Sequence, residues 1–389
     1  MALMPADKAD AFEADLVALQ ATMRRRVEEA YAARKDKHWV IWHDFCVSHN
    51  FDPLLRGVKD PIPYLQLFGA RYHDGSLAPR GNPVAVGTIS DAIRLVGQTL
   101  ARMGAADPRR DAFGKIDFRL SSMYSAYRKE DPPAMRVNPA PVKLVVQALN
   151  FYHHERPTPE RQAVSNMICI AFFFCLRPGK YTGTTTDDQA FALKDVVLFL
   201  GGRRLDNALT SDVEIQAATA VHLIFTTQKN GDKGEAIAHA RSGDPYCCPV
   251  TAIIRQLMLH RREFRRRDTP FDESVILATY YNRNNVRVPI KPKQITDMLR
   301  WHAGVLKHVT GMDPASISAR SLRAGGAMAL LIGGCDSNTI RLLARWRSDA
   351  MMRYLHQQAT PIFKRLAVTM FHTNYAFLPD AAVPSEVPQ

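Results

Sequence analysis

A proline-rich segment divides this 389-residue chain into two parts with different apolar periodicity. Residues 131–141, DPPAMRVNPAP, hold four prolines in eleven positions, and proline is excluded from helix interiors and central strands. Before this segment the sequence shows helical spacing and no strand-like alternation, whereas strand-like stretches follow it. We therefore predict a linker between two domains, which agrees with the two or three folding units expected of this length.

The part before the linker predicts a small helical bundle over residues 1–130. Apolar residues recur at three- and four-residue steps through 7–50, which is typical of an amphipathic helix. A second helix is expected to begin at Thr88, whose hydroxyl would cap it, and to run to Gly104. A third helix is expected over about 112–128.

The part after the linker predicts a mostly helical domain over residues 142–372 with one small antiparallel β-sheet, followed by a tail, 373–389. Everything from Pro249 onward is expected to be helical. The expected strands are 191–200, 220–227 and 235–241, the last two joined by a turn at 230–232. The expected helices are 141–153, 158–176, 249–264, 292–309, 317–333, 337–346, 348–357 and 361–371.

Charge and composition exclude several classes of protein. The chain has 51 basic and 38 acidic residues, and residues 141–389 alone hold 31 basic and 21 acidic ones, which points to a polyanionic partner. It has no apolar run long enough to span a membrane and no signal-peptide pattern at its start, so we expect an intracellular protein. The six cysteines are irregularly spaced and are expected to be reduced, and no P-loop, zinc-protease or serine-hydrolase motif occurs.

The densest set of candidate functional residues lies between 318 and 358. Arg320 and Arg323 are one helical turn apart, and the two glycines that follow, 325–326, would allow another backbone to approach closely. Trp346 and Tyr354 then lie eight residues apart within a run of arginines. Arginine binds phosphate oxygens in pairs and a tyrosine hydroxyl can attack phosphorus, although the pattern alone would also fit a solvated basic helix pair with core aromatics.

These residues resemble the catalytic domain of tyrosine recombinases, the phage-integrase superfamily. The strings RSLRAGG (320–326) and WRSDAMMRY (346–354) resemble its C-terminal half and are most similar to the recombinases of Crypton and DIRS-type eukaryotic mobile elements. CLRPGKY (175–181) resembles the box of the first arginine, and TTQKNGDKGE (226–235) resembles the hairpin that carries the family's lysine. The resemblance covers roughly residues 141–372.

The resemblance implies a chemistry for this site. Arg177 and Arg323 would hold the non-bridging oxygens of a scissile phosphate, and Trp346 would donate its indole N–H to the same group. Tyr354 would attack phosphorus to give a 3′-phosphotyrosine and a free 5′-hydroxyl. Because that bond conserves the energy of the phosphodiester, rejoining would need no ATP. The arginines would replace the metal ions that many nucleases use, so no cofactor is expected.

Two positions depart from the family pattern and one stays open. Arg320 stands where the family usually has His or Lys, and an arginine cannot act as a general base. Lys180 stands where an acidic residue commonly supports the first arginine; Asp187 and Asp188 are candidate substitutes. Lys229 is the expected general acid, and Lys233, past the turn, is its competitor.

We expect double-stranded DNA as the partner, held mainly through phosphate contacts that carry little sequence information. By resemblance, the N-terminal bundle is a core-binding domain that closes with the catalytic domain around the duplex. The C-terminal helix, about 360–372, would dock into a neighbouring subunit of a tetramer on paired sites; the alternative is that it folds back onto its own subunit. The residues expected to contact DNA outside the reacting centre are Arg24, Arg25, Lys233, Arg261, Arg262, Arg265, Arg266, Arg267, Arg345, Arg347 and Arg353.

The sequence therefore predicts a site-specific DNA recombinase or integrase, in the nucleus if the host is a eukaryote. Two alternatives remain. A type IB topoisomerase uses similar residues but acts alone and relaxes supercoils. A domesticated DNA-binding protein would keep the fold without the reaction, and Arg320 and Lys180 are the residues that favour it.

Overall fold

The computed structural model describes residues 29–132, 137–150, 157–183, 190–226 and 234–346. The chain divides into two compact units, residues 1–135 and 136–389. As the sequence predicts, the protein is mainly helical with a small antiparallel sheet. Within the described ranges, no helix has both the length and the apolar character that crossing a bilayer would require.

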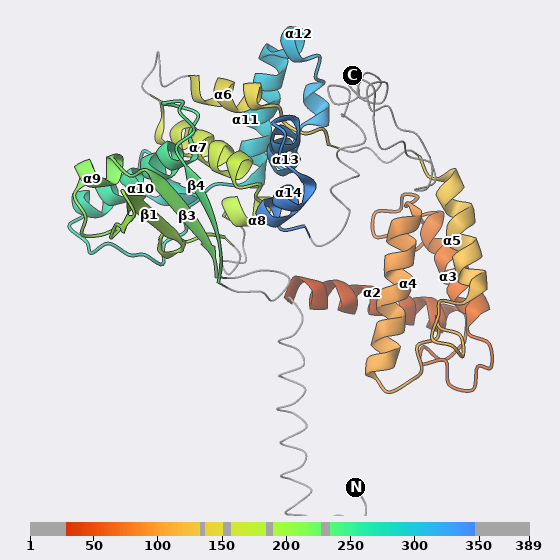
Figure 1. Ribbon diagram of the computed structural model, residues 1–389. Helices are drawn as coiled ribbons and strands as arrows, with labels where there is room; N and C mark the ends of the chain where they lie inside the picture. Colours follow the sequence, from red (N-terminus) through yellow and green to blue (C-terminus); the bar gives the residue numbers. More distant parts are fainter. Residues whose placement is uncertain (1–28, 133–136, 151–156, 184–189, 227–233, 347–389) are drawn as a thin grey trace, which may run out of the picture. The chain divides into compact units, whose positions relative to one another are not determined.

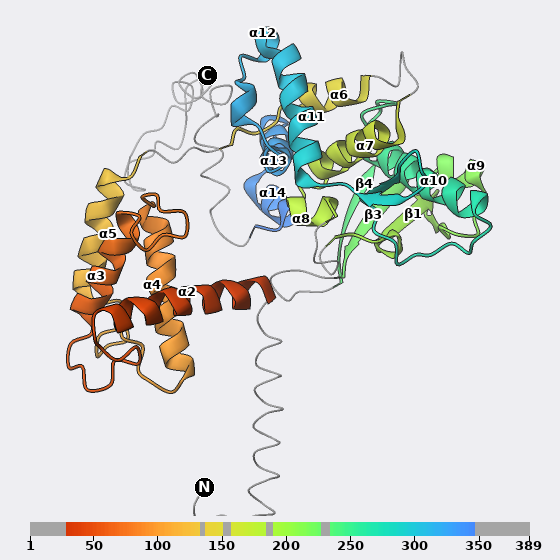
Figure 2. The ribbon, with the colours of Figure 1, turned by 180° about the vertical axis from the view of Figure 1, so that it is seen from behind.

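The first unit is a helical bundle around an aromatic core. Figure 2 shows α2 running across α3, α4 and α5. Trp42 is fully buried, its indole Nε1 donates to the Pro53 carbonyl (2.9 Å), and its ring meets that of Phe68 edge-on at 5.2 Å. The described helices of this unit are α2 (Glu29–Ser48), α3 (Ile62–His73), α4 (Val86–Arg102) and α5 (Phe118–Glu130).

Two helix starts in this bundle differ from those expected. Helix α4 begins at Val86, and Thr88 does not cap it; the Asp131 carboxylate accepts from the Val86 backbone N–H instead (3.0 Å). Helix α5 begins at Phe118, where the Asp117 side chain provides the cap. The first cap comes from a residue 45 positions away, which local patterning cannot reveal.

The second unit is built around α7 (Pro159–Phe173), which is buried over most of its length. The end of this helix lies in the apolar run ICIAFFF, 168–174. A helix segment that is apolar on all sides must be enclosed by other elements. Helices α6, α10, α11 and α13 pack against it (Figure 1). The other helices described are α6 (Val142–Leu149), α8 (Pro178–Tyr181), α9 (Asp212–Gln216), α10 (Pro249–Arg266), α11 (Pro292–Val305), α12 (Lys307–Thr310), α13 (Ser321–Ile332) and α14 (Ser337–Ala344).

The sheet of the second unit has the strand order β2-β1-β3-β4, and every neighbouring pair is antiparallel. The sheet contains the expected hairpin, which is formed by β3 and β4. His222 of β3 lies opposite Val197 of β1 on one side and Ala238 of β4 on the other. The strands are β1 (Val196–Leu200), β2 (Arg203–Arg204), β3 (Ala220–Phe225) and β4 (Glu235–Ala240).

The prediction that the chain is helical throughout from Pro249 onward is wrong. Strands β5 (Thr279–Tyr281) and β6 (Arg287–Pro289) form a separate two-stranded sheet. The Asn282 side chain closes their turn by accepting from the Val286 backbone N–H (2.9 Å). Three-residue strands are too short to show a period of two, so the sequence gives little sign of them.

The last residues of the proline-rich segment are part of the second unit. The Asn138 backbone N–H donates to the Ser316 carbonyl (2.8 Å), and that of Ala140 donates to the Ser321 carbonyl (3.0 Å). Residues 138–140 are therefore fixed against the segment that leads into α13.

Candidate functional site

Four cationic side chains lie near one another around α8, α13, the end of α14 and the end of β3; Figure 1 shows α8 between the sheet and α14. Arg177 caps the start of α8 and Lys180 lies within it, Arg323 lies on α13, and Arg345 caps the end of α14. The charges of Arg177, Arg323 and Lys180 all interact with that of Arg345. We call these four residues the cation cluster.

Arg323 is the most enclosed member, with 9% of its surface exposed. Its Nη2 donates to the Ala344 carbonyl at 2.5 Å, and its guanidinium carbon lies 5.2 Å from the centre of the Trp346 ring. Arg323 therefore holds the end of α14 and the half-buried Trp346 beside it. This contact joins two residues that are 23 positions apart and belong to separate sequence boxes.

Arg345 faces the end of β3. Its guanidinium carbon lies 3.5 Å from the centre of the Phe225 ring. Burial lowers the pKa of Arg345 to about 9, and the positive charges of Arg323 and Arg177 act in the same direction. The residue is still a cation at neutral pH.

Lys180 is half-buried against two aromatic rings. Its Nζ lies 5.5 Å from the centre of the Phe191 ring and 6.0 Å from that of Phe225, distances typical of cation–π contacts. Burial lowers the pKa of Lys180 to about 8; Asp195 opposes this shift and Arg345 adds to it. A lysine therefore occupies the position where the resemblance leads one to expect an acid.

Asp195 is an acidic residue near the cluster that sequence reasoning missed. It is buried, and its carboxylate accepts from Thr226 Oγ1 (3.0 Å) and from the Ala192 backbone N–H (2.8 Å). It precedes β1 in a stretch that reads only as a strand. The expected substitutes, Asp187 and Asp188, lie outside the described residues.

Tyr181 connects the box of the first arginine, 175–181, to the segment that leads into RSLRAGG, 320–326. Its hydroxyl donates to the Ala319 carbonyl at 2.6 Å, just before Arg320 and the start of α13. The ring is fully buried, and burial raises the pKa of the hydroxyl. Tyr181 is thus a structural residue that fixes α8 relative to α13.

We expect Tyr181→Phe to lower the free energy of unfolding by about 1–3 kcal/mol, because it leaves the Ala319 carbonyl without this donor. Urea denaturation measures the change. Tyr280→Phe is the matched control, since that hydroxyl has only a 3.4 Å contact with Gln294 Nε2. Equal losses in the two variants would contradict the role given to Tyr181.

The two glycines at 325–326 allow α13 to pack closely against other backbone segments, as the sequence predicts. A Cβ atom at Gly325 would overlap the Ala140 carbonyl, and one at Gly326 would overlap the Phe172 carbonyl near the end of α7. Helix α13 can therefore lie directly against these backbones, with Arg323 one turn before.

The remaining candidates for the reacting centre are only partly described. Arg177 and Arg320 are exposed, and Arg320 precedes α13 as its N-cap residue. The candidates that lie outside the described residues are Arg24, Arg25, Lys229, Lys233, Arg347, Arg353 and Tyr354.

The arginine run 261–267 at the end of α10 is largely paired within the protein. Arg261 is buried and its Nη2 donates to the Thr210 carbonyl (2.6 Å), so its side chain is engaged within the protein, and its contact with DNA stays a prediction. Arg262 is exposed. The ion pairs of the others are Arg265–Asp212 (2.6 Å), Arg266–Glu263 (2.5 Å) and Arg267–Glu263 (2.6 Å).

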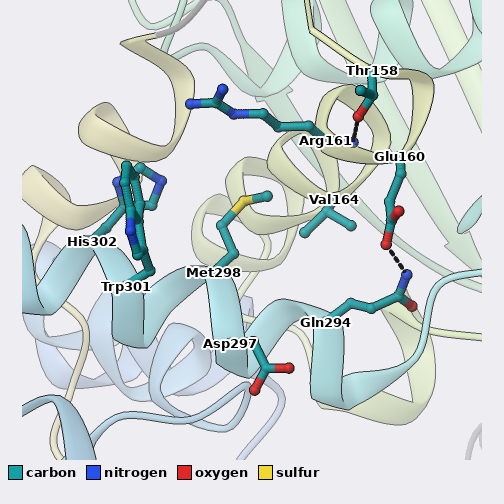
Figure 3. Close-up of a pocket in the computed structure, with 9 residues that line it drawn as sticks. All are labelled: Thr158, Glu160, Arg161, Val164, Gln294, Asp297, Met298, Trp301 and His302. Carbon is teal, nitrogen blue, oxygen red and sulfur yellow. Dashed lines mark hydrogen bonds between the residues drawn. The ribbon is translucent and has the colours of Figure 1, made fainter.

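A groove of about 450 Å³ lies between the start of α7 and α11 (Figure 3). Trp301 is 60% exposed, and its ring meets that of the buried His302 edge to face, with ring centres 4.6 Å apart. Burial lowers the pKa of His302 to about 4, and the charge of Arg161 adds to this shift. The cation cluster lies past the other end of α7, so the groove is a separate feature.

The cluster suits a phosphate group. Several fixed cations beside the end of a strand can bind the oxygens of a phosphodiester and stabilise the charge that grows on them during displacement at phosphorus. In the described ranges, no group of three or more His, Cys, Asp or Glu side chains is arranged to hold a metal ion.

Comparisons with known proteins give structural likenesses alone. No family model matches the chain, and no curated protein matches it. The Tn1549 transposon integrase in complex with circular intermediate DNA is 14% identical, with a TM-score of 0.47 and coverage of 92% of this chain and 98% of that one. XerH site-specific recombinase bound to palindromic difH substrate is 12% identical (TM-score 0.46; 82% and 73% covered), and XerA recombinase is 15% identical (TM-score 0.37; 92% and 97% covered). At these values the likeness does not assign an activity.

Proposed function

We propose that this protein is a site-specific DNA recombinase or integrase that cuts and rejoins DNA strands through Tyr354. The observation that carries the proposal is that Arg177 and Arg323 both lie near enough to Arg345 for their charges to act on it, although 146 positions separate them in the sequence. Trp346, from a third box, packs on Arg323. Such an assembly of separate boxes is not expected of unrelated basic helices.

In the proposed reaction, Arg177 and Arg323 bind the two non-bridging oxygens of the scissile phosphate. Both stay protonated, so they stabilise the extra negative charge of the transition state without a proton transfer. Tyr354 gives up its hydroxyl proton to solvent, because Arg320 cannot accept it, and its oxygen forms a bond to phosphorus while the bond from phosphorus to the 5′ oxygen breaks. The reverse displacement by a 5′-hydroxyl rejoins a strand and releases the tyrosine.

Lys229 is the proposed donor of the proton to the departing 5′ oxygen. Strand β3 ends at Phe225 and β4 begins at Glu235, and the Gly234 N–H donates to the Phe225 carbonyl (2.9 Å) at the base of the hairpin. The Phe225 ring contacts Arg345 of the cluster. The base of the hairpin therefore lies beside the proposed phosphate, which supports a proton donor from the turn that follows.

The wider assignments belong to the same proposal. The partner is double-stranded DNA, bound by a core-binding domain (1–130) and the catalytic domain (142–372) across the linker 131–141. We propose a tetramer on paired sites, with the segment 360–372 exchanged between subunits. Among such enzymes, the 346–354 box favours the Crypton and DIRS type of mobile element, whose recombinases would work in the nucleus of a eukaryotic host.

The test is covalent trapping on nicked DNA. A library of duplexes with randomised sequence and a nick near the cleavage position is incubated with the protein. Cleavage releases the short piece between the cleavage position and the nick, and the loss of its 5′-hydroxyl prevents rejoining and traps the adduct. We expect a protease-sensitive protein–DNA adduct on a denaturing gel for the wild type and for Tyr375→Phe, and none for Tyr354→Phe. An adduct that persists in Tyr354→Phe, or its absence in the wild type, would overturn the proposal.

The trapped sequences then allow strand exchange to be separated from relaxation. Two linear duplexes that carry a selected site are mixed, and recombinant lengths are sought. Recombinants identify a recombinase, whereas adducts with relaxed plasmid and no recombinants would identify a topoisomerase.

A further inference from the structure

We infer that Arg345 is a third arginine ligand of the phosphate bound at the cation cluster, beside Arg177 and Arg323. This inference rests on the proposed function and adds to it a residue that the family resemblance does not place in the reacting centre. Three features of Arg345 carry it: its backbone conformation, the environment of its guanidinium, and the like charges around it.

The backbone of Arg345 is strained. It ends α14 with φ 53° and ψ 51°, in the left-handed region that favours glycine or asparagine. A glycine would close this helix without strain. Strained residues of this kind persist where the surrounding structure holds them, and they concentrate at functional sites.

The guanidinium of Arg345 is enclosed but incompletely bonded. Its Nη1 is buried and has no hydrogen-bond partner among the described residues. One face of the group rests on the Phe225 ring. A buried, unpaired donor on a cation is costly, so an unmet partner with acceptor oxygens is expected at this position.

No carboxylate of the described residues forms an ion pair with Arg345. The charge of Glu235 favours the cation, but Arg323 and Arg177 oppose it, and Lys180 also interacts with Arg345 unfavourably. A bound anion would lower the repulsion between these like charges. The geometry therefore fits a tetrahedral oxyanion that these cations share, which in the proposed reaction is the scissile phosphate.

The first test measures anion binding without DNA. Sulfate is titrated into the full-length protein at pH 7 by calorimetry, because sulfate does not change its charge near this pH. Arg345→Gly suits the conformation of the backbone and removes the guanidinium; Arg341→Ala, one turn earlier on α14, is the matched control. We expect sulfate affinity to fall about 10- to 100-fold in Arg345→Gly, which is the loss of one charge-assisted hydrogen bond, and to stay unchanged in Arg341→Ala.

A second readout separates ligand binding from a structural role. In buffer without sulfate, Arg345→Gly should have a melting temperature equal to or above that of the wild type, since it relieves the strained backbone and removes an unpaired charge. Unchanged sulfate affinity in Arg345→Gly, or a clear drop in its melting temperature without sulfate, would overturn the inference.

The trapping assay then relates the inference to the reaction. Arg345→Gly should form adduct about 10- to 100-fold more slowly than the wild type. If the wild type forms adduct and Arg345→Gly matches it in rate, the inference fails while the proposed function stands. If the wild type forms no adduct, the proposed function fails, and the sulfate titration still decides whether Arg345 binds an oxyanion.

Discussion

Arg323→Ala is expected to slow adduct formation by a factor on the order of 10³, the size seen when one preorganised donor to a developing charge is removed. Arg323 is almost fully buried and its guanidinium is fixed between the Ala344 carbonyl and the Trp346 ring. In the proposed reaction it would therefore bind the phosphate without a further loss of side-chain freedom. Single-turnover cleavage of the nicked substrate measures the rate.

Arg323 also holds the end of α14, so the loss of rate must be separated from a loss of fold. Arg300→Ala is the matched control, because the Arg300 Nε likewise donates to a backbone carbonyl, that of Ile317 at 3.0 Å. We expect both variants to lose stability by about 1–2 kcal/mol, but only Arg323→Ala to lose the cleavage rate. A comparable rate loss in Arg300→Ala would show that the effect of Arg323 is structural.

Gly326→Ala is expected to destabilise the second unit by about 3 kcal/mol, because the added atom would overlap backbone, and moving a side chain cannot relieve such an overlap. The added Cβ would overlap the Phe172 carbonyl, which belongs to the backbone of the central helix α7. To make room, α13 would have to move away from α7 and carry Arg323 with it. Denaturant unfolding of the full chain, followed through the transition of the second unit, measures the loss.

Gly304→Ala supplies the control, since Gly304 also lies within a helix of the second unit, and its Cβ would meet only Pro314 Cγ at 3.9 Å. Alanine favours a helix over glycine, so this variant should be neutral or up to about 1 kcal/mol more stable. If Gly326→Ala behaved in the same way, the close approach of α13 to α7 would not matter for the fold.

The sequence by itself determined the elements that depend on neighbouring residues. The period of apolar residues gave α7, α10 and the hairpin of β3 and β4, and the proline-rich segment lies where the two compact units meet. The glycine pair 325–326 predicted a close backbone approach, because glycine destabilises a helix interior and two adjacent glycines there indicate a packing requirement. The types of residue in the boxes also favour phosphate chemistry, since arginines and a tyrosine hydroxyl are suited to it.

Only the tertiary structure decided which charges are free and which are satisfied. In the sequence, Arg261 and Arg345 each stand in a basic run. In the fold, Arg261 donates to the Thr210 carbonyl and pairs with Asp212 (3.2 Å), whereas Arg345 has no ion pair with a carboxylate of the described residues. Each of the two keeps one buried guanidinium nitrogen without a partner in the described part of the chain. The partners of such groups come from segments tens or hundreds of positions away, as Asp131 does for α4. Local periodicity reports burial, but the pairing of charges and hydrogen bonds depends on distances in space, and these exist only once the helices have packed.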